Sequence, residues 1–326
     1  MDRRTALSTL GGAMLAAFSA QVHSQSLSGR TLRFMVGYPA GGVADFIART
    51  TTEGLKGALG ATVLVENRPG AAGNIALEFV AKSAGDSGVF GAFSNSQLTT
   101  NAFVPQLVPK NVDPLKDLVP VIALVDMILV LAVRSDLGVK TLDQFLAKAR
   151  EMGPRMRMGL AGIGAPHHLA ALLIQRAAGL DMLLVPYKGG PPMIADAAGG
   201  HLDAVITTVP VGGPMVAAGK LNWIAVVQPN TIASLPGVPS LAPILKGETI
   251  PTWNGIFAPA GTPAAVLNEL HAAMQTILHS PATTAKLRTN GLEPLNLTRA
   301  ETASRLADEA AYMKDFLSKV KLDFST

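Results

Sequence analysis

The sequence has no cysteine, few aromatic residues and few charged residues. The absence of cysteine from all 326 residues excludes disulfides, thiolate metal sites and a cysteine nucleophile. Aromatic residues make up 5% of the chain, its lysines and arginines are dispersed, and its net charge is +4, so we expect no nucleic-acid-binding surface. Because 48% of the residues are hydrophobic and only 15% are charged, the chain can form substantial cores. Its length suits two domains.

The sequence also lacks the common catalytic and metal-binding motifs. It has no Gly-x-Ser-x-Gly elbow, no Walker A loop, no His-Glu-x-x-His and no Gly-x-Gly-x-x-Gly after a strand. His167 and His168 are adjacent, and neighbouring side chains on a helix point about 100° apart, which makes them poor joint metal ligands. We therefore expect no catalytic site, no metal ion and no cofactor.

The N-terminus has the pattern of a secretory signal peptide. Charged residues 2–4 precede an apolar stretch at 9–18, and polar residues 21–25 follow. An amphipathic first helix is the alternative, which Gly11-Gly12 in its middle disfavours. The pattern therefore predicts export.

The predicted signal peptide covers residues 1–24, with cleavage after Ala20 as an alternative. The arginine pair leaves both the general secretory and the twin-arginine route open. No later stretch of about twenty apolar residues follows, because the run at 121–133 is shorter and is interrupted by Asp126. We therefore expect the mature protein to be exported and soluble.

Strand and helix patterns alternate along the chain. Strands are expected at 31–37, 62–66, 89–93, 156–160, 183–186, 203–207 and 253–258. Helices are expected at 44–59, 74–84, 192–198, 264–279, 281–290 and 298–318, with two more after the Thr141 capping box and between Ala165 and Gly179. This order predicts an α/β fold with parallel sheets.

One apolar run, at 121–133, is too long for an ordinary strand. It would extend roughly 40 Å, so we interpret it as a strand that leaves one domain and enters another. The alternative is a buried strand that ends in an irregular segment. A second run, at 222–228, suits the return. The predicted lobes are 25–125 with 227–326, and 126–226, with a ligand cleft between them.

Glycine-rich or polar loops follow five of the expected strands. They lie at 39–42, 66–74, 94–97, 159–168 and 186–190. Backbone N–H groups of such loops, with the positive end of the following helix, bind an anion without a charged side chain. Asp45 follows the first loop and could either cap its N–H groups, the commoner role, or contact a ligand. Five such loops in both lobes predict an anion site in the cleft.

Several segments resemble a known family. They are 36–42 (Val-Gly-Tyr-Pro-Ala-Gly-Gly), 65–75, 113–117, 185–190, 217–221, 235–240 and 257–263. In these segments the chain resembles the periplasmic solute receptors of the tripartite tricarboxylate transporter family, called Bug proteins. The resemblance covers nearly the whole chain after the signal peptide, in order.

The resemblance implies a type II periplasmic binding protein. In this fold two α/β lobes are joined by two crossing strands and close on a small solute. The family's first and fourth loops hold a carboxylate through backbone N–H groups, small hydroxyls and ordered water. We therefore expect a periplasmic monomer that captures a small carboxylate and delivers it to membrane transporter subunits.

Three segments depart from the family pattern. The fourth loop usually carries Asn and a Ser/Thr pair, but Ile163, Ala165 and Pro166 stand there. Relatives often carry Asp or Asn where this chain has Thr207-Thr208, and Phe or Pro where it has Tyr38. We therefore expect a mono- or dicarboxylate with an apolar or aromatic body rather than a tricarboxylate.

The candidate site combines these loops. Ligand-binding residues expected from the first lobe are Tyr38, Ala40, Gly41, Gly42, Asp45, Asn74, Ser94 and Asn95. Those expected from the second lobe are Gly162, Gly164, His168, Tyr187 and Thr208. Either tyrosine could pack against the ligand, and His168 could instead be structural.

Two other functions remain open. One is an enzyme acting on a carboxylate, which the lack of a nucleophile–base pair disfavours. The other is a carboxylate-sensing partner of a membrane signalling protein.

Overall fold

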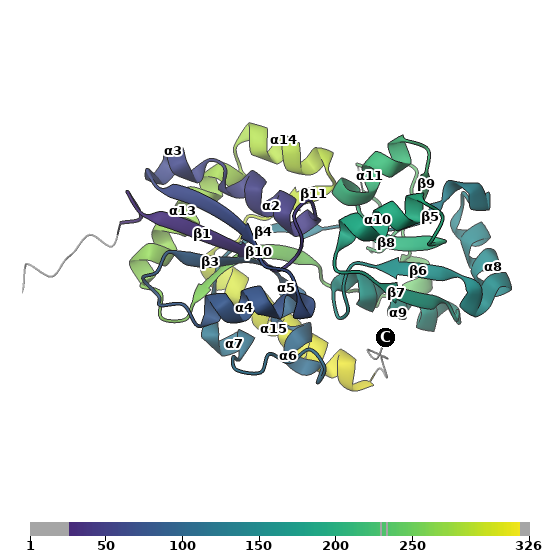
Figure 1. Ribbon diagram of the computed structural model, residues 1–326, viewed down its shortest axis with the longest axis horizontal. Helices are drawn as coiled ribbons and strands as arrows, with labels where there is room; N and C mark the ends of the chain where they lie inside the picture. The colour runs from purple at the N-terminus through teal and green to yellow at the C-terminus, as the bar shows by residue number, and fades with distance from the viewer. Residues whose placement is uncertain (1–25, 229, 233, 320–326) are drawn as a thin grey trace, which may run out of the picture.

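The protein folds into two α/β lobes, each with one sheet flanked by helices (Figure 1). The structure is a computed structural model that describes residues 26–228, 230–232 and 234–319. The predicted signal peptide, residues 1–24, lies outside the described residues. The prediction of a two-lobed α/β fold is confirmed.

The first lobe contains a six-stranded mixed sheet. Its strands, in spatial order, are β11 (Leu292–Pro294), β4 (Leu118–Met127), β10 (Trp253–Pro259), β3 (Val89–Ser94), β1 (Thr31–Val36) and β2 (Thr62–Asn67). β1 is parallel to β2 and β3, whereas β10 is antiparallel to β3 and β4. The parallel half is the part that the strand–helix alternation predicted.

Helices cover both faces of this sheet (Figure 1). They are α2 (Val43–Thr52), α3 (Leu55–Leu59), α4 (Asn74–Ala81), α5 (Asn95–Leu98), α6 (Thr100–Phe103), α7 (Pro114–Asp117), α13 (Ala264–Leu278), α14 (Pro281–Thr289) and α15 (Arg299–Lys319), with a 3-10 turn η1 (Ala71–Gly73). The single helix expected at 44–59 is two helices. At the break, a Cβ on Gly54 would lie 2.9 Å from Cγ1 of Ile277, so glycine lets α13 approach closely where α3 begins.

The second lobe contains a five-stranded sheet. Its spatial order is β7 (Leu183–Pro186), β6 (Arg157–Leu160), β8 (Ala204–Thr208), β5 (Leu129–Arg134) and β9 (Leu221–Val226). Its helices are α8 (Leu142–Met152), α9 (Pro166–Ala178), α10 (Gly190–Ala198), α11 (Val209–Ala217) and α12 (Ala242–Leu245), with 3-10 turns η2 (Ser135–Leu137) and η3 (Gly153–Arg155). The capping box at Thr141 and the left-handed C-cap at Gly179 are confirmed.

Two chain crossings join the lobes. β4 of the first sheet leads into β5 of the second through Ile128 alone, so the long apolar run does leave one sheet and enter another. The run at 222–228 does not make the return, because β9 pairs with β5 in the second sheet. The chain instead returns just before β10, where the N–H of Met127 donates to the carbonyl of Thr252 at 2.8 Å.

The segment between β9 and β10 packs on the second lobe. Leu241, Leu245 and Ile250 lie in the hydrophobic core that contains β5, β6 and α9. Met313 and Phe316 of α15 join the same core, although α15 also packs against β4 of the first lobe. This packing favours a lobe limit near residue 251, later than the 227 predicted from sequence.

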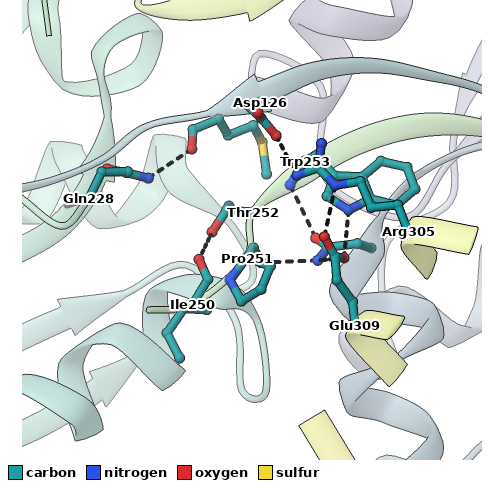
Figure 2. A network of polar contacts seen from close by, with 10 residues as sticks. Asp126, Gln228, Ile250, Pro251, Thr252, Trp253, Arg305 and Glu309 are labelled. Atoms are coloured by element: carbon teal, nitrogen blue, oxygen red, sulfur yellow. Dashed lines mark hydrogen bonds and ion pairs between the residues drawn. The ribbon is translucent and has the colours of Figure 1, made fainter. Parts of the chain in front are cut away.

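A polar network fastens α15 to the crossings (Figure 2). Glu309 accepts hydrogen bonds from Trp253 Nε1 at 2.6 Å and Asn95 Nδ2 at 2.9 Å. Arg305 Nη2 donates to Asp126 at 2.7 Å. The long C-terminal helix therefore holds both crossing segments from one side.

None of the helices in the described part of the chain is long and apolar enough to cross a membrane.

Candidate ligand-binding site

Helix N-termini from both lobes meet around one cavity. The cavity is lined by residues from the starts of α2 in the first lobe and of α9, α10 and α11 in the second. Each of these helices follows the carboxyl end of a strand through a short connection. Unpaired N–H groups and the helix dipole make such termini favourable for negative charge.

The two lobes approach each other closely at two places. A Cβ placed on Gly189 of the second lobe would lie only 2.9 Å from Cδ of Pro39 in the first. A Cβ on Gly164 would lie 2.0 Å from Cδ1 of Leu107, again across the lobes. Glycine at these positions therefore permits close lobe contact. The space among the four helix N-termini, which we call the inner cavity, has a volume of about 40 Å³.

The lining of the inner cavity is mainly apolar and uncharged. Met127, Pro166 and Val211 contribute apolar surface. The polar side chains in the lining are Tyr38, Ser94, His167, Thr207, Thr208 and Asn254. No Asp, Glu, Lys or Arg from residues 26–228, 230–232 and 234–319 belongs to this lining. Any anion bound here must be stabilised by N–H groups, hydroxyls and helix dipoles.

Three polar atoms of the inner cavity are buried without a hydrogen-bond partner among the described residues. They are Nδ1 of His167, Oγ1 of Thr208 and Oδ1 of Asn254. Buried polar atoms in folded proteins are nearly always hydrogen-bonded to protein, water or ligand. Residues that line the inner cavity therefore carry hydrogen-bonding capacity that the described part of the chain leaves unused.

The two titratable side chains of the inner cavity are neutral at pH 7. Burial lowers the pKa of His167 to about 4, because the imidazolium loses its hydration. Burial also raises the pKa of Tyr38 to about 12. The cavity therefore offers hydrogen bonds but no side-chain charge.

Asp45 caps the first loop. The N–H of Gly41 donates to its Oδ2 at 3.0 Å, and Arg49 and Asn67 donate to its Oδ1 at 2.9 and 3.0 Å. Burial opposes ionisation of this carboxyl, but the bonds from Arg49, Gly41 and Asn67 outweigh it and hold the pKa of Asp45 below its ordinary value. Of the two roles considered from sequence, this geometry is that of capping.

The side chains of His168 and Tyr187 form hydrogen bonds with groups of their own lobe. The N–H of Gly164 donates to Nδ1 of His168 at 3.1 Å, which fixes the fourth loop against α9. The hydroxyl of Tyr187 donates to Asp196 on α10 at 2.6 Å. Burial, followed by this hydrogen bond, raises the pKa of Tyr187 to about 12.

A second, larger space, which we call the outer cavity, is lined by residues of both lobes and measures about 360 Å³. The first lobe contributes residues 37–38, 70–74 and 106–107 to it, and the second contributes 162–163 and 186–188. Ala71 and Ala72 adopt φ of 47° and 54° there, a left-handed conformation that costs non-glycine residues roughly 1–2 kcal/mol each. Such strain often accompanies binding loops.

The structure distributes the predicted site residues over three places. Tyr38, Gly42, Ser94 and Thr208 line the inner cavity. Tyr38, Asn74, Gly162 and Tyr187 line the outer cavity. Six line neither, namely Ala40, Gly41, Asp45, Asn95, Gly164 and His168. Of these, Ala40 and Gly41 are exposed, Asp45 and His168 hold loops, and Asn95 belongs to the network at the crossings.

Sequence reasoning missed three polar residues of the inner cavity, namely Thr207, which precedes the predicted Thr208, and the more distant His167 and Asn254. His167 was considered only as half of a histidine pair, because the pattern did not tell which face of α9 turns to the cleft. Asn254 lies within β10. It is at least 46 residues away in sequence from every other polar residue of the lining. No local signal marked it.

The fold and this site define an α/β solute-binding protein with two lobes. The chain belongs to the family described as the tripartite tricarboxylate transporter family receptor, which matches residues 47–322. This confirms the resemblance noted from sequence, and the family is one of periplasmic binding proteins.

Relatives include a named Bug protein and two structures with bound carboxylates. Protein BugT of Bordetella pertussis is 29% identical over 296 residues, which cover 90% of each chain. Rpa4515 of R. palustris, solved with adipate, is 27% identical with a TM-score of 0.82, over 89% of this chain and 97% of that one. MatC of Rhodopseudomonas palustris, solved with bound malate, is 25% identical with a TM-score of 0.81, over 88% and 98%.

Proposed function

We propose that this protein is a periplasmic receptor that captures a small organic mono- or dicarboxylate between its lobes. It then delivers the solute to a membrane transporter of the tripartite tricarboxylate type. The observation that carries the proposal is the inner cavity, where helix N-termini of both lobes converge on buried polar atoms with unused hydrogen-bonding capacity.

The lining supports a carboxylate of low charge. One carboxylate can be held by N–H groups in the first turn of α2, where Val43 and Ala44 line the inner cavity. Each further carboxylate would have to be desolvated beside neutral and apolar groups, at a cost of several kcal/mol. The bound adipate and malate of the two structural relatives support a dicarboxylate as the upper limit, and the apolar lining supports an aliphatic or aromatic body.

Lobe closure supplies the coupling between binding and delivery. A ligand that contacts both lobes binds the closed arrangement more tightly and shifts the open–closed equilibrium toward it. The transporter then distinguishes closed receptor from open receptor. In this proposal the protein acts as an exported monomer without cofactor, and it binds its ligand without chemical change.

Isothermal titration calorimetry of the mature protein tests the proposal. We expect at least one of benzoate, hexanoate, adipate and malate to bind more tightly than citrate. Tighter binding of citrate than of all four, or no binding of any carboxylate, would overturn it. Chromatography of the bound ligand after incubation checks for turnover, which would favour the enzyme alternative. Pull-down from membranes with and without ligand identifies either transporter subunits or a signalling protein.

A further inference from the structure

The three unpartnered polar atoms of the inner cavity come from three elements and both lobes. His167 lies in the first turn of α9, Thr208 ends β8, and Asn254 lies in β10 of the first lobe. Their residues are 8%, 1% and 3% exposed. The amide nitrogen of Asn254 donates to the sulfur of Met127 at 3.3 Å, a weak acceptor, so Oδ1 is the atom left for a ligand.

These atoms suit a neutral group better than a carboxylate. A hydroxyl of threonine and a neutral imidazole can each donate or accept, and the asparagine oxygen accepts. The acceptor oxygen would repel a carboxylate, and within the described residues no cation lines the cavity to compensate a buried negative charge. A hydroxyl or a carboxamide brings a donor for the asparagine oxygen and an acceptor for threonine or histidine.

We propose that His167, Thr208 and Asn254 form a polar subsite for an uncharged hydrogen-bonding group, a hydroxyl or carboxamide, at the end of the ligand opposite its carboxylate. This inference rests on the proposed function and narrows it to monocarboxylates with a neutral polar tail. A site built to hydrogen-bond a substrate group rejects the analogue that lacks the group, because the buried partners stay unpaired.

Matched acids that differ only at the far end test the subsite. For chains of four, five and six carbons, calorimetry at pH 7.5 compares the alkyl acid, the terminal hydroxy acid, the terminal carboxamide acid and the dicarboxylate. At the chain length that binds best, we expect the hydroxy or carboxamide acid to bind at least about tenfold more tightly than the alkyl acid and the dicarboxylate.

Two threonine variants separate the subsite from general effects on folding. Thr208→Val keeps the shape of the side chain and removes its hydroxyl, so we expect it to abolish the preference over the alkyl acid. Thr100→Val is the matched control, because the Thr100 hydroxyl is equally buried and unpartnered among the described residues but does not line the inner cavity. It should leave both affinities unchanged.

The outcomes separate this inference from the proposed function. If the acids bind but the dicarboxylate or the alkyl acid binds as tightly as the neutral polar ones, the subsite inference is wrong and the receptor function stands. An unchanged preference in Thr208→Val also contradicts the subsite. If neither these acids nor aromatic carboxylates bind, the proposed function fails and the inference fails with it.

Discussion

Gly189 is the position where a single methyl group should hold the two lobes apart. Its φ of 160° is extended backbone that any residue adopts, so alanine adds no backbone strain. The added Cβ would lie 2.9 Å from Cδ and 3.3 Å from Cγ of Pro39 in the opposite lobe. Both atoms belong to a rigid ring, so relief of the overlap requires the lobes to separate.

The expected magnitude follows from the overlap. Overpacking by one methyl group typically costs about 1–3 kcal/mol, and each 1.4 kcal/mol corresponds to a factor of about ten in affinity. Gly189→Ala should therefore weaken carboxylate binding about 5- to 150-fold, measured by calorimetry. The free energy of unfolding without ligand should fall by no more than about 1 kcal/mol, from the poorer N-cap of α10. Gly189→Ser adds the same Cβ with a better cap and should lose affinity equally.

A control glycine lies in the same lobe. A Cβ on Gly213 of α11 would have no atom within 4 Å, so Gly213→Ala should leave the affinity at the wild-type value. If Gly189→Ala also binds with wild-type affinity, lobe closure against Pro39 is not part of binding and the reasoning is refuted.

Three further predictions concern stability. Glu309→Leu removes the acceptor of Trp253 Nε1 and of one N–H of the Asn95 amide, whose other N–H still donates to Pro251. Urea denaturation should therefore show a loss of about 2–4 kcal/mol, and an unchanged midpoint would show that the network at the crossings is dispensable. The pKa of His167 in the folded protein is about 4, below the ordinary 6.5. The free energy of unfolding therefore keeps its full value above pH 6.5, where the imidazole is neutral in both states, and falls as the pH decreases toward 4. Between pH 7 and 5 the wild type should therefore lose about 2 kcal/mol more stability than His167→Gln, and parallel pH profiles would contradict this. Ala72→Gly should raise the free energy of unfolding by about 0.5–1 kcal/mol, because glycine tolerates the left-handed φ of 54°; thermal unfolding that shows a loss would contradict the assigned strain.

The parts of the fold that local sequence determines were predictable. The strand at 183–186, the Thr141 capping box and the glycine that ends α9 all follow from neighbouring residues. The split between α2 and α3 and the position of the return crossing were not, because distant packing decides them. α13 approaches Gly54, and the segment before β10 finds its hydrophobic partners in the second lobe.

The candidate site shows the same division. The glycine turn before α2 and the capping role of Asp45 could be inferred from a strand, a loop and a helix in succession. His167 and Asn254 could not, because their places depend on how α9 is rotated and on which strand lies beside β3 and β4. The polar chemistry of the inner cavity therefore became visible only in the assembled structure.

The central claim is that the space between the lobes captures a small carboxylate of low charge. A thermal-shift screen of the mature protein against mono-, di- and tricarboxylates, aromatic ones included, tests it most directly. At one hundred times its dissociation constant, a ligand adds roughly 2.7 kcal/mol of stability, which raises the melting temperature by several degrees. The account predicts such a shift with at least one mono- or dicarboxylate. No shift with any of them, or a shift with tricarboxylates alone, would contradict it.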